Sequence, residues 1–120
     1  MGSDDDKEAR DEPLRDLLLA LVHSNEDKIG SALESVLKGS KHAALVLDVT
    51  KEEIPRKELV RKTKIDATNI TKVTGPLVRA GWLHQRTEGA EVRYHRSDVI
   101  GVLLGDRTLP QWRKERQANE

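Results

Sequence analysis

The sequence predicts a mainly α-helical domain that carries a small β-hairpin. Apolar residues recur at helical spacing through most of the chain, and this pattern gives way to two short alternating segments around a glycine between residues 82 and 96. Aromatic residues make up only 2% of the 120 residues, so the core must be built from Leu, Val, Ile and Ala, which favours closely packed helices. The length suits one domain with a modest core.

Two amphipathic helices are predicted near the N-terminus. The first starts near Pro13, because proline suits a first helical turn, where its missing donor would be unpaired. Ser24 followed by Asp27 resembles a capping signal for the second helix, which Gly39 ends. The sequence favours equally the packing of this pair within the chain and its pairing with a second subunit. The first helix is predicted from apolar residues that share one stripe: Leu14, Leu17, Leu18, Leu21 and Val22.

Three shorter helices follow. Ser40 can cap a helix that is apolar on most sides and therefore central, and Ile54 is then expected to pair with a strand of the hairpin. Residues 56–64 predict a second helix with its basic side chains outward. Asp66 stands where an N-cap should, before a third helix. Pro76 lies inside that third helix and predicts a bend there.

The hairpin is predicted from residues 82–87 and 91–96 around a two-residue Gly89-Ala90 turn. Glycine in the first turn position allows the type II′ geometry that suits hairpins. The register places Leu83, Val92 and Tyr94 on the buried face. On the other face it sets Arg86 opposite Arg93 and His84 opposite His95.

This order of helix, turn, helix and hairpin is that of a winged helix-turn-helix with extra N-terminal helices. Ser97 can cap a further helix after the hairpin, and Trp112 is the one large anchor of the segment beyond it. The predicted organisation is a disordered acidic tail, a helical pair, a winged helix-turn-helix domain and a C-terminal tail, over residues 1–12, 13–39, 40–105 and 106–120.

The stretch from Ala43 to Arg96 resembles the winged helix-turn-helix regulators of bacteria and archaea, in the superfamily of the multiple-antibiotic-resistance and arsenic-sensor repressors. The similarity rests on LVLDV for the first helix, IPRKELVRKTKI for the second, DATNITKVTGPLVRAGWLHQR for the recognition helix and first wing strand, and EVRYHRS for the second wing strand. It implies a DNA-binding transcriptional regulator. Pro76 departs from the usual pattern, and Glu88 and Glu91 near the wing tip argue against deep contact of the wing with DNA.

The formal net charge of zero conceals a strong division along the chain. Residues 1–54 hold seven Lys and Arg against thirteen Asp and Glu, a net of −6, whereas residues 55–96 hold ten against four, a net of +6. A polyanion would be drawn to the middle segment, because phosphate neutralisation and counterion release supply most non-specific affinity for nucleic acid. The alternative is a set of ordinary charged surface helices.

Short polar side chains near a helix N-terminus can reach base edges, and neighbouring cations can hold phosphates. Thr68, Asn69, Thr71 and Lys72 are the predicted base readers, since Asn pairs with adenine, Lys with guanine and the Thr methyl with thymine. For each of these residues the alternative is an ordinary solvated position. The predicted phosphate contacts are Arg56, Lys57, Arg61, Lys62 and Lys64 on the preceding helix, with Arg86 and Arg93 on the wing.

Several other functions find no support in the sequence. The absence of cysteine excludes disulfides, thiolate metal sites and cysteine nucleophiles, and fits a reducing compartment. His84 opposite His95 lacks a third ligand, so no metal is predicted. We also expect no catalytic residue and no cofactor, because acidic pairs in apolar surroundings and a glycine-rich phosphate loop are missing. With no membrane-length apolar run and no signal-peptide pattern, we expect a cytoplasmic, nucleoid-associated protein.

The sequence therefore predicts a sequence-specific double-stranded DNA-binding protein, a transcriptional regulator that acts as a homodimer. Its N-terminal helices and the Trp112 segment are the predicted dimer surfaces. The alternative is a winged-helix docking module that binds a partner protein within replication, partition or transcription machinery.

Overall fold

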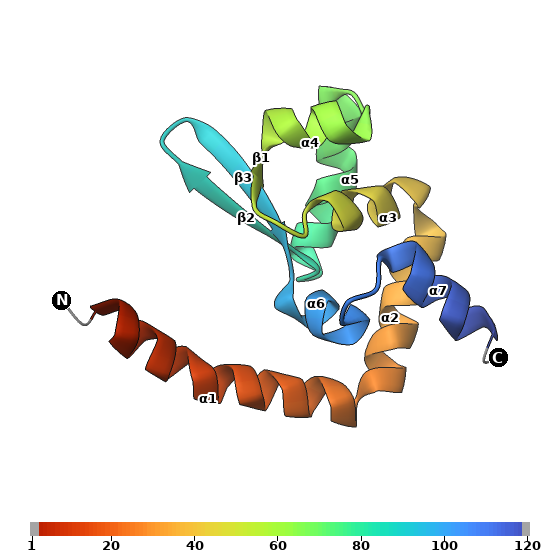
Figure 1. The fold of residues 1–120 in the computed structure, drawn as a ribbon. Helices are drawn as coiled ribbons and strands as arrows, with labels where there is room; N and C mark the ends of the chain where they lie inside the picture. The colour runs from red at the N-terminus through yellow and green to blue at the C-terminus, as the bar shows by residue number, and fades with distance from the viewer. Residues whose placement is uncertain (1–2, 119–120) are drawn as a thin grey trace.

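The computed structural model describes the backbone of residues 3–118 and the side chains of residues 13–118. Within this range the chain forms seven helices and a small antiparallel sheet (Figure 1). The fold is mainly α with a hairpin wing, so the predicted class is confirmed. The elements are α1 (Ser3–Ser24), α2 (Glu26–Gly39), α3 (Lys41–Val49), β1 (Ile54–Pro55), α4 (Arg56–Thr63), α5 (Ala67–Arg79), β2 (Leu83–Glu88), β3 (Glu91–Arg96), α6 (Asp98–Leu104) and α7 (Leu109–Ala118).

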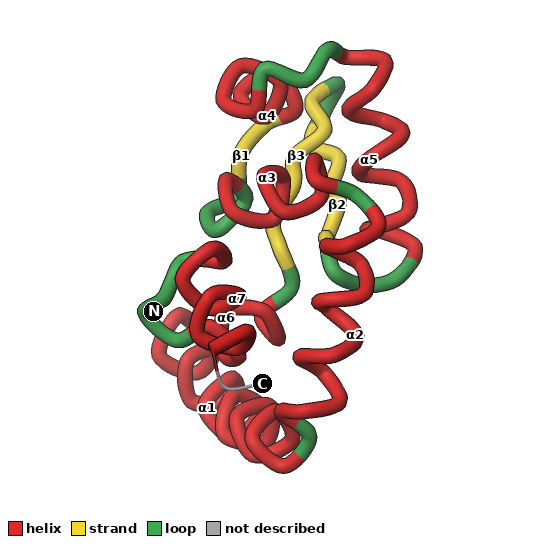
Figure 2. The backbone as a smooth tube through the Cα atoms, turned by 90° about the vertical axis from the view of Figure 1, so that its right-hand side faces the viewer, coloured by secondary structure: helices red, strands yellow, loops and turns green. Residues whose placement is uncertain are grey.

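The molecule is flat, with extents of 45 × 43 × 22 Å, and its elements occupy two ends. Figure 2 shows α4, the sheet and the start of α5 at one end, with α1, α6 and α7 at the other. Helix α3 packs against α4 and α5 and also against α2 and α7, and so joins the two ends. The core that runs between them is aliphatic, as the composition predicts, with Leu33, Val46, Leu47, Leu59, Ile70, Ile100 and Leu104 fully buried.

The sheet has the strand order β1-β3-β2 and the predicted register. Ile54 pairs with Tyr94, which confirms that the segment before α4 adds a strand to the hairpin. Gly89 has a φ of 62°, whereas Ala90 does not have a positive φ. This combination is the one that a type II′ turn requires, because only its first central residue is left-handed.

Three of the four predicted helix caps are confirmed. The side chains of Ser40, Asp66 and Ser97 each accept a hydrogen bond from the first turn of the following helix. The predicted Ser24 cap is wrong, because Ser24 is still the last residue of α1. Asn25 precedes α2 instead, and its side chain donates to the Leu21 carbonyl, so it closes α1 rather than capping α2.

The two ends of the chain also depart from prediction. Helix α1 begins at Ser3, with Pro13 inside it, and not near Pro13. The predicted disorder of residues 1–12 stays a prediction, and Met1, Gly2 and the side chains of this segment lie outside the described part of the chain.

The predicted C-terminal tail is largely a helix, α7, docked on α2. Leu109 is fully buried and Trp112 is 4% exposed. Gly30 permits this docking, because a Cβ at that position would lie 2.6 Å from Arg116 Nη1 and 3.3 Å from the Trp112 ring. Trp112 is therefore a core residue of its own chain, while a dimer surface on the segment around it stays a prediction.

Candidate nucleic-acid interface

The turn between α4 and α5 is held by local hydrogen bonds. The Thr63 hydroxyl donates to the Leu59 carbonyl at 2.6 Å and accepts from the Ile65 amide at 3.3 Å. Lys64 takes the left-handed conformation, with a φ of 60°, and directs the chain toward α5. Ile65 is 6% exposed and anchors the turn in the core. These contacts fix the angle at which α5 leaves α4.

Helix α5 presents a polar face beyond its buried side. Ile70 and Leu77 are buried, whereas Thr68, Asn69 and Lys72 are exposed. Thr71 is exposed as well, so the four predicted base readers share the outer side of the first turns. The helix continues through Pro76 to Arg79.

Asn69 is engaged with the helix cap. One Asp66 carboxylate oxygen accepts from the Asn69 backbone amide at 2.9 Å, and the other accepts from the Asn69 side-chain amide at 3.1 Å. Both residues are exposed, so the Asn69 side chain can exchange this contact for another partner. In the free protein it stabilises the N-terminus of α5.

Arg56 joins the two helices to the sheet. Its Nη2 donates to the Ala67 carbonyl at 2.8 Å and to the Thr71 hydroxyl at 2.6 Å, and its Nη1 donates to the Tyr94 hydroxyl at 3.3 Å. The guanidinium therefore ties the first turn of α5 to β3. This is a positioning contact, and it also engages Thr71, one of the predicted base readers.

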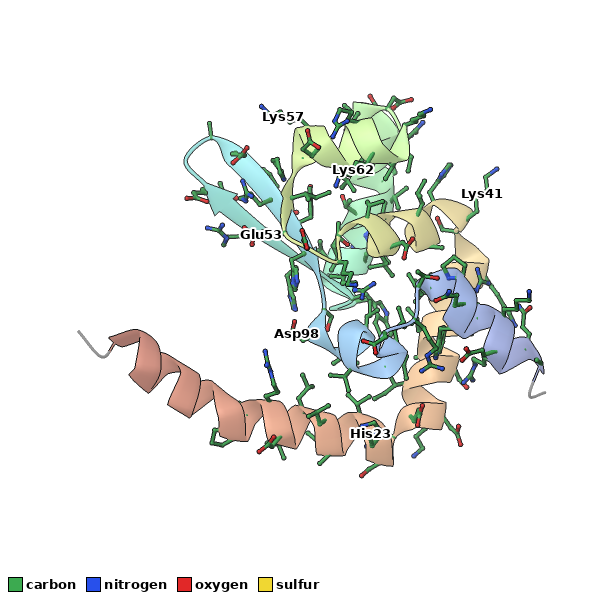
Figure 3. The ribbon with its side chains drawn as sticks, viewed as in Figure 1. His23, Lys41, Glu53, Lys57, Lys62 and Asp98 are labelled. Atoms are coloured by element: carbon green, nitrogen blue, oxygen red, sulfur yellow. The ribbon has the colours of Figure 1, made fainter. Side chains whose placement is uncertain are left out.

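The remaining cations of α4 and α5 divide into paired and unpaired groups. Arg61 forms an ion pair with Glu58, and this contact lowers the pKa of the Glu58 carboxyl. Lys57 and Lys62 lie on α4 at the end of the molecule away from α1 (Figure 3). Five basic side chains of α4, α5 and their turn are exposed and form no ion pair with any described side chain. They are Lys57, Lys62, Lys64, Lys72 and Arg79.

The wing arginines are held by carboxylates. Glu53, which precedes β1, accepts from Arg86 at 2.5 Å and from Arg93 at 2.9 Å. Arg86 also pairs with Glu88 at 3.0 Å, and Arg93 with Glu91 at 2.8 Å. The two guanidinium groups lower the pKa of Glu53 to about 2, so this carboxylate is ionised at neutral pH. Glu53 lies beside the hairpin in Figure 3.

Arg96 contributes to the sequence charge but is not on the surface. It is 6% exposed, and its Nη1 donates to the Leu47 carbonyl at 3.4 Å. Burial lowers the pKa of its guanidinium. Of the ten basic residues between positions 55 and 96, half are therefore committed to internal contacts, and the unpaired cations are those of α4, α5 and their turn.

Glu53 is the site residue that the sequence reasoning missed. The predicted pairing of Ile54 with the hairpin contained the signal, because Ile54 lies opposite Tyr94 and side chains alternate along a strand. Residue 53 then falls on the sheet face that carries Arg93 and Arg86. Glu53 is one of thirteen acidic residues among positions 1–54, so the charge pattern alone does not indicate that it pairs with Arg86 and Arg93.

The histidines of the wing face each other as predicted, with His84 opposite His95. Within residues 13–118 no group of three or more His, Cys, Asp or Glu side chains is placed to hold a metal ion. The described helices include none that is long and apolar enough to cross a membrane.

Comparison with known proteins shows the fold and little more. No family model matches the chain, and a search of curated proteins also gives no match. Among solved structures, reduced HlyU from Vibrio cholerae N16961 is similar, with a TM-score of 0.51 and 19% sequence identity over 66% of this chain and 90% of that chain. The similarity supports the winged-helix fold.

Proposed function

We propose that this protein binds double-stranded DNA through the first turns of α5 and regulates transcription. The observation that carries the proposal is the exposed polar face of Thr68, Asn69 and Lys72 on the second helix of a helix-turn-helix, bordered by unpaired cations. A major groove admits one helix, and short polar side chains on such a helix reach base edges.

The two groups of residues have different tasks in this proposal. Thr68, Asn69 and Lys72 read bases, and Thr71 can do so where its bond to Arg56 is exchanged. Lys57, Lys62 and Lys64 hold phosphates and fix the register, a contribution that depends on salt and not on sequence. Arg61 joins them if it leaves Glu58, while Arg56 acts by orienting α5.

We also propose that the protein acts as a homodimer through α1. Leu14, Leu17 and Leu21 are 65%, 56% and 53% exposed, although the neighbouring Leu18 and Val22 pack inward. An apolar groove of about 430 Å³ continues this surface, with Leu21, Ile29, Ala32, Trp82 and Val99 among its lining residues. Exposed apolar surface of this kind marks a site of interaction with another protein.

Titration of a fluorescent duplex tests the DNA-binding proposal. Anisotropy is measured with a random-sequence duplex at low and physiological salt, and then with duplexes enriched by rounds of selection on the protein. We expect affinity that falls steeply with salt on the random duplex and a tighter, enriched sequence. A protein that leaves every duplex free at low salt acts through another partner, which favours the winged-helix docking module.

A further inference from the structure

The ion cluster along the wing has an unusual composition for a surface that approaches DNA. It consists of two guanidinium groups and three carboxylates, Arg86, Arg93, Glu53, Glu88 and Glu91, with a net charge of −1. Glu53 is the shared member, because it pairs with both arginines, whereas Glu88 and Glu91 each pair with one. The cluster is therefore slightly anionic although it contains two arginines.

We propose that Glu53 limits the affinity of this protein for duplex DNA, because it holds Arg86 and Arg93 away from the DNA backbone, so that binding depends on α5. The inference rests on the proposed function and deepens it, because it assigns the wing a role in limiting affinity for arbitrary sequence. Phosphate contacts are the part of an interface that carries no sequence information. A wing that lacks them raises the share of the binding energy that base readout supplies.

The geometry makes the exchange of partners unfavourable. Arg93 is 25% exposed in its side chain and Glu53 is 34% exposed, so the pair is partly withdrawn from water. A phosphate that displaced Glu53 from either arginine would leave a carboxylate close to the phosphate, and like charges in such proximity repel. Glu88 and Glu91 add the same repulsion nearer the tip.

Replacing Glu53 by Gln provides the test, and the chain offers a matched control. Glu52 is the adjacent residue, is exposed, and forms no ion pair with any described side chain, so E52Q removes the same charge without freeing an arginine. Affinity for one random-sequence duplex is measured for wild type, E53Q and E52Q across a salt series. Thermal unfolding by circular dichroism confirms beforehand that each variant is folded.

We expect E53Q to bind the random duplex about tenfold more tightly at 0.1 M salt, with a salt dependence steeper by about 1 to 2, since each new phosphate contact adds about 0.9 to the slope. E52Q should change affinity by less than about threefold and leave the slope unchanged. The triple variant E53Q/R86Q/R93Q should lose the gain. Affinity for a selected duplex should rise by about the same factor, because phosphate contacts carry no sequence information.

Equal effects of E53Q and E52Q, with wild type binding DNA, would overturn the inference and leave the proposed function standing. If wild type, E53Q and E52Q all leave both the random and the selected duplexes free at low salt, both proposals are overturned. Binding of the random duplex by E53Q alone, with wild type binding the selected duplex, supports the inference in its strongest form. If E53Q does not fold, the salt dependence of duplex binding is measured for R86Q/R93Q, which retains Glu53. An unchanged salt slope for that variant supports the inference, and a slope flatter by about 2 contradicts it.

Discussion

At the scale of single residues, Arg56 shows how one side chain can set the position of a recognition helix without belonging to its outer face. Its guanidinium spans a backbone carbonyl and a hydroxyl of α5 and the hydroxyl of Tyr94 on β3. These acceptors diverge in direction, and the planar fork of arginine can satisfy them together, whereas the point charge of lysine cannot. The orientation of α5 relative to the wing depends on this contact.

Replacing Arg56 by Ala should lower the free energy of unfolding by about 1–2 kcal/mol, because three hydrogen bonds from a charged donor are lost, one of them in a partly buried position. R56K should restore little of it. K57A, at the next and exposed position, should leave stability unchanged while weakening binding to every duplex. Denaturant unfolding measures the stability of each variant, and anisotropy of a fluorescent duplex measures its affinity for DNA. Equal stability of R56A and K57A would show that the Arg56 contacts do not hold α5.

Glu53 provides a pH-dependent contribution to stability. Its pKa is about 2 in the folded protein against an ordinary value of 4.5, because the Arg86 and Arg93 guanidinium groups hydrogen-bond to it. A lowered folded-state pKa gives stability that is complete above the unfolded pKa and is lost as the pH falls toward the folded one. The difference in urea midpoint between wild type and E53Q should therefore be constant above about pH 5 and shrink between pH 4.5 and 2. A difference that persists undiminished to pH 2 would contradict this assignment.

At the scale of elements, the sequence predicts those parts whose signals are local. The caps at Ser40, Asp66 and Ser97, and the β3 strand with its register, follow from side-chain chemistry within a few residues. Helix α7 was missed because Leu109 and Trp112 are its only fully buried apolar residues within the described range, so charge dominates its pattern. Its burial depends on Gly30, 82 positions earlier than Trp112, and no local pattern contains that contact.

Helix α5 carries the prediction that separates base readout from phosphate attraction. N69A should reduce discrimination at one base pair by about 1–3 kcal/mol, because the amide can pair with a base edge, whereas K62A should weaken all sequences alike and flatten the salt slope by about 1. Since Asn69 also donates to Asp66, N69A stability is measured in parallel. Equal losses for N69A on selected and random duplexes would count against base readout by this residue.

At the scale of the whole molecule, the distribution of charge is only partly readable from sequence. The division into an acidic and a basic segment is a property of the chain, but ion pairing across the fold decides which cations remain available. Glu53 belongs to the acidic segment and neutralises two arginines of the basic one. Such pairs join residues 33 and 40 positions apart, so they require the strand pairing to be known first.

The molecule is also less compact than its length allows. Its radius of gyration is 15.6 Å, whereas a compact chain of this length has a radius of about 13.6 Å. Helix α1 contributes to this extension, and it leaves one row of leucines exposed while a second row packs against the core. A second copy that covers the exposed row would place the two α5 helices on one assembly, and a two-fold pair recognises a pseudo-palindromic site.

The dimer proposal therefore predicts that charge on this row abolishes association without unfolding the chain. L17E/L21E should be monomeric by sedimentation equilibrium at concentrations where wild type is dimeric, and its Tm should fall only to the extent that dimerisation stabilises the wild type. L45E is the matched control, because Leu45 is an exposed leucine, 38% accessible, on α3 and not on α1. On a selected palindromic duplex, L17E/L21E should bind half-sites independently and lose the affinity that linkage of two sites provides. An L17E/L21E variant that still associates would place the interface elsewhere. A wild type that is monomeric at all concentrations would remove the interface, and recognition of a single site by α5 would then have to supply the whole of the DNA affinity.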